Sequence, residues 1–341
     1  MPPYLRPARS MSLTQFKWGI IAPGRIAHNF AQGLEVIDDA TLYGVASSDS
    51  ARAQSFANTF GGTAKCYDHY DALIADPAVD AIYIANPHRY HYDCVERCLE
   101  AGKPVLCEKP LTVTAAESER LFALAESKGV FLMEALWSRF LPVWQAVKTW
   151  LDAQLIGEIK VISSTFGFNI PHNTQDRLLN KEDAGGVLLD MGVYNVAMSQ
   201  FVMGRDPSHI LADGVVGETG VDERSSALLN YDGAVSMFTA NFQAKTANDM
   251  TISGTEGAIV IDSEFWATRT ATLTTHDGKV TVFKEPFRAS GFEYQTEEAM
   301  RCIRAGKLQS DVIPWKDTLG NMRTMDEILT QIGVDYPFTT R

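Results

Sequence analysis

The 341-residue sequence has little cysteine, no long apolar run and no excess of positive charge. Its five cysteines are an odd number without a Cys-x-x-Cys pair, so we expect no disulfide framework but buried thiols in a reducing cytoplasm. No uncharged apolar stretch reaches the roughly 18 residues that a membrane-spanning helix needs. Lys and Arg number 30 against 42 Asp and Glu, and this acidic balance disfavours nucleic-acid and membrane-surface partners. The cysteines are Cys66, Cys94, Cys98, Cys107 and Cys302.

The chain is longer than one hydrophobic core usually serves, so we expect two domains of unequal type. Hydrophobic residues make up 45% and charged residues 21% of the sequence, an ordinary globular composition that excludes a disordered or fibrous chain. Residues 1–14 contain prolines and arginines and lack the apolar core of a secretory signal. We interpret residues 1–14 as a disordered or added extension outside the fold.

Residues 15–137 alternate short apolar runs with stretches of helical spacing. A continuous apolar run suits a strand buried on both faces, and an amphipathic helix after each such strand gives a parallel sheet covered on both sides. We therefore predict an α/β fold whose first domain, residues 15–137, is a doubly wound parallel sheet of the Rossmann type. The expected helices cover residues 25–34, 50–60, 90–101 and 114–128.

The pattern changes after residue 137. A helix over 143–151 and a long strand over 159–168 precede short runs rich in Val, Thr and aromatics that are broken by turns. We predict that residues 138–341 form an α+β substrate-binding domain on an open, mainly antiparallel sheet, closed by helices over 293–305 and 315–332. Apolar residues fall on both faces of the run 234–243, so we expect the outer face of this sheet to be covered.

The turn after the first expected strand points to a nucleotide. It reads Ala22-Pro23-Gly24-Arg25-Ile26-Ala27, against the Gly-x-Gly-x-x-Gly/Ala of a dinucleotide-binding turn. Gly24 would let a pyrophosphate approach the backbone at a helix N-terminus, and Ala27 would keep helix and strand close. Ala22 replaces the first glycine and weakens the pattern. We predict that Ala22, Gly24, Arg25 and Ile26 contact the cofactor.

The end of the second expected strand indicates which dinucleotide. An NAD site places Asp or Glu there for the ribose 2′-hydroxyl, whereas a 2′-phosphate needs donors and a cation. Ser47, Ser48 and Arg52 supply both, so we predict NADP, with NAD less favoured. Asp49 argues for NAD, unless it serves as the N-cap of the next helix.

Two further strand ends and one helix carry a resemblance to a known family. The segments are Asn86-Pro87-His88-x-x-His91, Glu108-Lys109-Pro110 and Asp190-x-Gly192-x-Tyr194. In this order they resemble the glucose-fructose oxidoreductase, inositol dehydrogenase and rhizopine-catabolism (Gfo/Idh/MocA) family, with tyrosine where most members have histidine. That tyrosine form is similar to the branch of dimeric dihydrodiol dehydrogenases and NADP-dependent D-xylose dehydrogenases.

The resemblance implies roles for individual residues. It places Asn86, Pro87, His88, His91, Glu108 and Lys109 at the cofactor, and implies a cis Lys109–Pro110 peptide. It suggests Trp137, Phe168, Arg177 and Tyr194 as substrate contacts, and a homodimer that buries the outer face of the C-terminal sheet. His88 and His91 lie three apart, but no third ligand with suitable spacing accompanies them, so we expect no metal.

The chemistry of Lys109, Asp190 and Tyr194 also makes sense without the resemblance. Asp190 and Tyr194 are four residues apart and would share one helix face, with Gly192 leaving room for a flat ring. Tyrosine is a poor base at neutral pH, but an adjacent ammonium lowers the pKa of its phenol. Tyr194 would take the proton of a substrate hydroxyl while Lys109 polarises the same oxygen. Asp190 would pair with Lys109 or hold a neighbouring hydroxyl.

These residues predict an NADP-dependent oxidoreductase. Its substrate would be a small polyhydroxylated molecule, namely a sugar, cyclic polyol or trans-dihydrodiol, and we expect the protein in the cytoplasm. Two alternatives stay open: a catalytically silent NADP-binding sensor of the same fold, and an NAD-dependent glycosidase-type enzyme. The presence of both Lys109 and Tyr194 favours catalysis, and the tyrosine disfavours the glycosidase, which resembles the histidine form.

Overall fold

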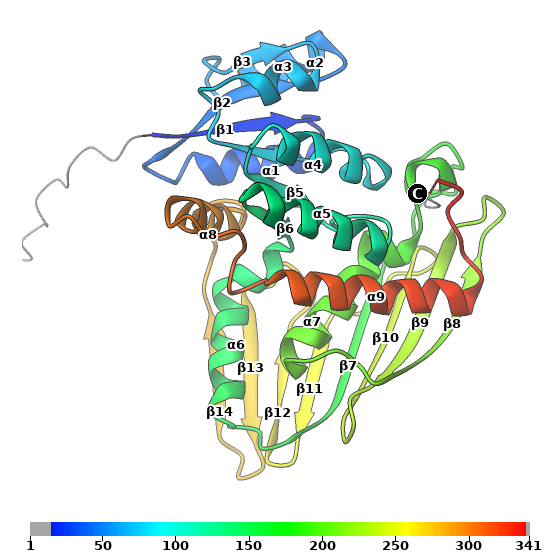
Figure 1. Ribbon diagram of the computed structural model, residues 1–341. Coiled ribbons are helices and arrows are strands. Elements are labelled where there is room, and N and C mark those ends of the chain that lie inside the picture. Colours follow the sequence, from blue (N-terminus) through cyan, green and yellow to red (C-terminus); the bar gives the residue numbers. More distant parts are fainter. Residues whose placement is uncertain (1–14, 339–341) are drawn as a thin grey trace, which may run out of the picture.

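A computed structural model describes residues 15–338. The predicted extension over residues 1–14 lies outside the described residues. Two sheets lie one above the other, and helix α9 (Trp315–Ile332) runs along the boundary between them (Figure 1). The first sheet has the strand order β3-β2-β1-β4-β5-β6, and the second has the order β14-β13-β12-β11-β7-β10-β9-β8.

The first sheet is the predicted Rossmann-type sheet, because all its strand pairs are parallel. Successive residues of one strand lie in different hydrophobic cores: Ile20 belongs to one and Ile21 to the other, so both faces are buried. This explains why its strands read as continuous apolar runs. The strands are β1 (Phe16–Ile21), β2 (Ala40–Ala46), β3 (Lys65–Tyr67), β4 (Ala81–Ile84), β5 (Val105–Glu108) and β6 (Leu132–Ala135). The helices are α1 (Arg25–Leu34), α2 (Ser50–Thr59), α3 (Tyr70–Ala75), α4 (His91–Glu100) and α5 (Ala115–Lys128), with a 3₁₀ turn, η1, at His88–Tyr90.

Helix caps explain where two of these helices begin. Asp49 accepts a hydrogen bond from the Arg52 backbone N–H at 3.2 Å, so it is the N-cap of α2. Asp49 thus has the capping role that the sequence allowed for it. Thr114 accepts from the Glu117 backbone N–H at 3.3 Å and caps α5 in the same way.

The second sheet is mainly antiparallel, as predicted, and its one parallel pair joins β7 to β10. The chain enters it through the 3₁₀ turn η2 (Trp137–Phe140) and α6 (Pro142–Asp152). Its strands are β7 (Ile159–Gly167), β8 (His209–Val216), β9 (Asp222–Asn230), β10 (Val235–Asn241), β11 (Met250–Gly254), β12 (Gly257–Ile261), β13 (Thr270–Thr275) and β14 (Val280–Lys284). Its other elements are η3 (Lys181–Asp183), a π-helical turn η4 (Leu188–Gly192), α7 (Val193–Met203), α8 (Glu293–Arg304) and α9.

Among residues 15–338, helices cover one face of the second sheet and not the other (Figure 1). On that face α6 contacts β13 and β14, α7 contacts β7 and β10, and α9 contacts β8 and β9. The other face carries exposed apolar side chains, including Met237 at 42% and Val280 at 58% exposure. The remaining ones are Leu211, Val216, Val260 and Val282.

The two domains touch through their helices. Helix α8 contacts α1, and α9 contacts α5 as well as α7. Gly33 of α1 permits the first contact, because a Cβ there would lie 2.9 Å from the backbone nitrogen of Glu293. The helices that lie between the sheets thereby fix how the ends of the first sheet face the second domain.

Two smaller expectations have clear outcomes. Cys94, Cys98, Cys107 and Cys302 are buried, but Cys66 is exposed because it lies on the edge strand β3, so the expectation of uniformly buried thiols was wrong for it. Within residues 15–338, no helix combines the length and the apolar character needed to cross a membrane.

Candidate active site between the two sheets

A pocket of about 770 Å³ lies where the strand ends of the first sheet face the second domain. It gathers residues predicted separately from the nucleotide turn, the strand-end loops and the η4–α7 helix. Ser47 and Ser48 do not line it: Ser47 is buried and accepts a hydrogen bond from the Asp49 backbone N–H, and Ser48 is exposed. The predicted residues that do line it are Ala22, Gly24, Arg25, Ile26, Arg52, Asn86, Pro87, His88, His91, Glu108, Lys109, Trp137, Phe168, Arg177, Asp190 and Tyr194.

The nucleotide turn leaves space for a phosphate. Ala22 has φ 62°, the left-handed conformation that the first glycine of the usual pattern adopts freely and alanine adopts only with strain. A Cβ at Gly24 would meet only the Ala22 carbonyl oxygen, at 3.9 Å. Gly24 is also the N-cap of α1 and offers no side chain to the helix N–H groups. This turn therefore fits the pyrophosphate of a dinucleotide, whose charge the helix N-terminus favours.

Arg52 is a cation that lines the pocket outside the nucleotide turn. It stands in the first turn of α2, and its side chain is 61% exposed and 3.9 Å from the Asp49 carboxylate. Such a loose pair leaves the guanidinium able to bind another anion. The part of the pocket next to α1 and α2 thus offers Arg25 and Arg52 beside an open helix end.

His91 connects the ends of two strands. Its ring nitrogens lie 2.8 Å from the carbonyl oxygens of Asn86 and Pro110, which follow β4 and β5. Burial lowers the pKa of His91 to about 4, against the raising effect of the two carbonyl groups, and a neutral ring donates its one N–H to one of them. The Lys109–Pro110 peptide is cis, as the resemblance implied. His91 therefore fixes the loop that carries Lys109.

Glu108 lines the pocket, and its carboxyl group is hydrogen-bonded within the first domain. It accepts a hydrogen bond from the Tyr83 hydroxyl, and Tyr83 stacks on Phe30 with ring centroids 3.9 Å apart. Burial raises the pKa of Glu108 to about 7, against the opposing effects of the Tyr83 hydrogen bond and the Lys109 charge. Glu108 is thus held by a hydrogen bond within its own domain.

Lys109 and Tyr194 meet from opposite sides of the pocket. The Lys109 ammonium lies 5.1 Å from the centroid of the Tyr194 ring. The same ammonium donates to the backbone carbonyl oxygen of Asp190 at 2.5 Å. The Tyr194 hydroxyl oxygen accepts a hydrogen bond from Trp137 Nε1 at 2.9 Å. A phenol, an ammonium and an indole from three elements therefore converge at one end of the pocket.

Asp190 plays a different part from the one expected. Its backbone carbonyl binds Lys109, while its carboxylate accepts from Arg177 at 3.0 Å and lies 3.9 Å from His88 Nε2. Burial alone would raise the pKa of Asp190, but the positive charges of Lys109 and Arg177 lower it to about 2. Asp190 therefore stays ionised and balances the cations of the pocket.

The structure also changes the expected electrostatics of Tyr194. Burial, followed by the negative charge of Glu108, raises its pKa well above 10. The phenol in this structure holds its proton, whereas the sequence argument expected a lowered pKa from Lys109. Gly192 was expected to make room for a ring, but a Cβ there would meet Leu188 at 2.8 Å and Ala240 at 3.5 Å. The space beside Gly192 is instead filled by the Leu188 side chain of the same turn.

A cluster of aromatic side chains from the second domain adjoins Tyr194 in the pocket. Trp266 stacks on Phe166 with centroids 3.5 Å apart and planes at 8°, and Phe168 meets Trp266 edge-on. Phe166 adjoins the predicted Phe168, but Trp266 follows β12 in a segment without regular spacing, so no sequence pattern identified it. The other lining residues that the sequence argument missed are Asn29, Ala85, Ile170, Leu178, Met191, Phe242 and Phe292.

The described residues contain no group of three or more His, Cys, Asp and Glu side chains placed to hold a metal.

A Rossmann-type sheet with an open nucleotide turn, joined across a pocket to a second sheet, is typical of NAD(P)-dependent oxidoreductases. Residues 16–136 match the model of an oxidoreductase family with an NAD-binding Rossmann fold, and residues 144–260 match the GFO/IDH/MocA C-terminal domain. The chain belongs to the Gfo/Idh/MocA family and is an NAD(P)-binding oxidoreductase.

Curated relatives span nearly the whole chain. A trans-1,2-dihydrobenzene-1,2-diol dehydrogenase of Xenopus laevis is 37% identical over 333 residues, which cover 94% of this chain and 99% of the relative. The enzyme of the same name from Homo sapiens is 33% identical over 330 residues, covering 94% and 98%. These identities agree with the tyrosine-form branch that the sequence resembles.

Solved structures share the arrangement of both domains. A 3-ketoreductase from Actinomadura kijaniata, in complex with NADP and TDP-benzene, has a TM-score of 0.82 at 26% identity and covers 94% of this chain and 98% of its own. A levoglucosan dehydrogenase in complex with NADH and levoglucosan has a TM-score of 0.85 at 19% identity, covering 95% and 100%, and shares the fold.

Proposed function

We propose that the protein is an NADP-dependent dehydrogenase of a small polyhydroxylated molecule, with trans-dihydrodiols as the first candidates and sugars or cyclic polyols as the others. The observation that supports this most is the meeting of Tyr194 and Lys109 in a pocket that the aromatic side chains of Phe168 and Trp266 also line. A flat or weakly polar ring fits against Trp266 and Phe168, while its hydroxyl groups face the polar end. The names of the curated relatives favour a dihydrodiol.

The residues of this chain divide the work of the reaction. Bound NADP supplies or accepts the hydride, and its phosphates would be held by the Gly24 turn, Arg25 and Arg52. Tyr194 exchanges a proton with the substrate oxygen, as general base in oxidation and general acid in reduction. Lys109 stabilises negative charge on that oxygen, since its ammonium is buried beside the ring of Tyr194. Asp190 offsets the charges of Lys109 and Arg177, and His91 fixes the loop of Lys109.

The proposed function is tested by a screen of nucleotide reduction. Purified protein is incubated with NADP or NAD and with trans-dihydrodiols of benzene and naphthalene, aldoses such as D-xylose, and cyclic polyols. We expect reduction of NADP with at least one dihydrodiol, at a kcat/KM above that for the sugars. NADP binding, seen by fluorescence, without turnover of any substrate would replace the proposal with the sensor alternative. Turnover with sugars alone would keep the assignment as an oxidoreductase and would change the proposed substrate from a dihydrodiol to a sugar.

Replacing Arg52 with alanine is expected to raise the KM for NADP by about tenfold while changing the KM for NAD less than twofold. The guanidinium would lose a charge-assisted contact that only the 2′-phosphate makes. Arg25→Ala serves as the comparison, because Arg25 stands at the turn itself and would affect both nucleotides. Steady-state kinetics with each nucleotide measures the effect, and equal changes for NADP and NAD would contradict the role of Arg52.

We further propose a homodimer through the uncovered face of the second sheet. Exposed apolar side chains such as Met237 and Val260 stand on that face with Ser163 and Thr251 between them, and exposed apolar surface favours association. We expect the wild-type protein to sediment as a dimer and Met237→Glu to sediment as a monomer with an unchanged circular dichroism spectrum. The exposed Leu155, outside the sheet, provides a matched control: Leu155→Glu should leave the dimer intact. A monomeric wild-type protein would contradict the proposal.

A further inference from the structure

One hydrogen bond of the pocket joins side chains of the two domains. The indole nitrogen of Trp137 lies 2.9 Å from the Tyr194 hydroxyl oxygen, and both residues are over nine-tenths buried. An indole N–H can only donate, so the phenol oxygen is the acceptor. None of residues 15–338 accepts a hydrogen bond from the Tyr194 hydroxyl in this structure, so its hydrogen is available to a molecule in the pocket.

Packing holds the indole of Trp137 in one position. Its ring lies 4.8 Å from that of Phe292 and 6.1 Å from that of Phe287. A Cβ at Gly291, which has φ 93°, would be 2.7 Å from the indole carbon Cζ3. The following residue, Ser138, donates to the Trp266 carbonyl oxygen at 2.6 Å. The donor is thus fixed before any substrate arrives, which a catalytic hydrogen bond needs to be effective.

The charges around Tyr194 mostly oppose its ionisation. Burial raises the pKa of Tyr194 most, and negative charge on Glu108 and Asp190 adds to this, whereas the hydrogen bond from Trp137 lowers it. The Lys109 ammonium lies over the face of the Tyr194 ring, 5.1 Å from its centroid. The titratable groups that face Tyr194 are Tyr83 on β4, Glu108 and Lys109 at the end of β5, Glu134 on β6, and Asp190 in η4.

We propose that Trp137 is a positioning residue for proton transfer, whose indole N–H turns the hydrogen of Tyr194 toward the substrate and stabilises the ionised phenol oxygen. This goes beyond a place in the substrate wall and rests on the proposed acid/base role of Tyr194. In oxidation the substrate O–H bond breaks, and the proton moves to the Tyr194 oxygen while the hydride leaves for NADP. The Trp137 bond stays in place throughout and stabilises the ionised phenol that has to form before that step.

The first test is the pH profile of substrate oxidation in Trp137→Phe, using the substrate that gives the highest kcat/KM in the screen. Losing the donor should move the acidic limb of kcat/KM to higher pH by about one unit, the size expected for one hydrogen bond to an ionised group. Oxidation at neutral pH should then fall by about tenfold and recover as the pH is raised. NADP binding, measured by fluorescence titration, should be unchanged.

Trp144→Phe is the matched control. Trp144 is also fully buried, and its Nε1 donates to the Phe265 carbonyl oxygen at 2.8 Å, away from the pocket. This variant should keep the wild-type pH profile. A loss of activity in Trp137→Phe that is equal at every pH would show only a packing role and would overturn the inference, as would an unchanged profile.

A second measurement needs no turnover. The indole N–H resonance of Trp137 is assigned as the one that is absent from the NMR spectrum of Trp137→Phe. In Tyr194→Phe this resonance should move upfield, because the hydrogen-bond acceptor of the indole is gone. The resonance of Trp144 should stay in place. An unmoved resonance would overturn the inference. If Tyr194→Phe turns over like wild type, the proposed acid/base role fails; if it is inactive but the profile of Trp137→Phe is unshifted, only the Trp137 inference fails.

Discussion

Tyr194→Phe is expected to lower kcat for substrate oxidation by about 10²- to 10⁴-fold, the usual contribution of a positioned general acid or base. The substitution removes one oxygen from a buried ring that packs against Phe166 and Lys109, so the shape of the pocket is kept. It also leaves the Trp137 indole without its acceptor, which is a smaller loss. Because no part of the nucleotide turn is touched, the dissociation constant for NADPH should change by less than about twofold.

Tyr231→Phe provides the control for the loss of a buried hydroxyl. Tyr231 is 1% exposed, and its hydroxyl has no hydrogen-bond partner among the described residues. Its phenol lies in the second domain without lining the pocket, so this variant should keep wild-type kcat. Single-turnover measurements with bound NADP separate chemistry from product release. Turnover of Tyr194→Phe comparable to that of wild type would refute the acid/base assignment.

Lys109→Met is expected to lower kcat/KM by about 10²- to 10³-fold, comparable to removing one preorganised donor from a site of developing negative charge. Methionine keeps most of the length of the side chain but neither donates to the Asp190 carbonyl nor carries the charge. Asp190 retains its pair with Arg177 at 3.0 Å, so its carboxylate is not left alone. Steady-state kinetics at several pH values measures the loss, which raising the pH should not restore.

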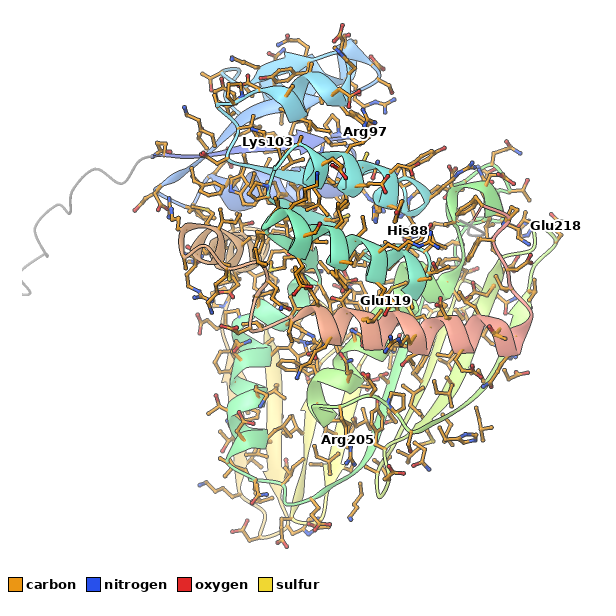
Figure 2. The ribbon with its side chains drawn as sticks, viewed as in Figure 1. His88, Arg97, Lys103, Glu119, Arg205 and Glu218 are labelled. Carbon is orange, nitrogen blue, oxygen red and sulfur yellow. The ribbon has the colours of Figure 1, made fainter. Side chains whose placement is uncertain are left out.

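Lys103→Met tests whether any lysine beside β5 gives the same result. Lys103 precedes β5 as Lys109 follows it, and its ammonium also donates to backbone carbonyl oxygens, those of Asp76 and Val79. Figure 2 shows Lys103 away from the domain boundary, whereas His88 lies near it. Lys103→Met should lower thermal stability and leave kcat/KM at the wild-type value. A loss of activity similar to that of Lys109→Met would indicate a general effect of destabilising the sheet.

The sequence predicted the first domain well because its signals are local. Buried parallel strands read as continuous apolar runs, and Asp49 and Thr114 mark helix starts within three residues of their partners. Strand order is not local: nothing in β7 or β10 alone announces that they pair in parallel within an otherwise antiparallel sheet. The ends of parallel strands do share one edge of a sheet, so the meeting of the first domain's site residues was predictable.

The finer contacts of the site depend on partners far apart in the chain. Asp190 was expected to pair with Lys109 or to hold a neighbouring hydroxyl. In the structure its carboxylate accepts a hydrogen bond from Arg177, and its backbone carbonyl accepts one from Lys109. Trp266 is separated from Phe166 by whole strands and carries no spacing signal. The pKa of Tyr194 depends on burial more than on one neighbouring charge, and burial cannot be read from a helical pattern.

The π-helical turn η4 lies just before Tyr194, so the direction in which Tyr194 points depends on the number of residues in that turn. A π-turn contains one residue more than the α-helix around it needs, and such insertions persist mainly where function requires them. Removing that residue would regularise the helix and relieve its cost, but would rotate everything before or after it by about 100°. The carbonyl that holds Lys109 and the phenol it faces lie on either side of that point. A single-codon deletion there is therefore expected to give a more regular helix in which Lys109 and Tyr194 no longer face each other.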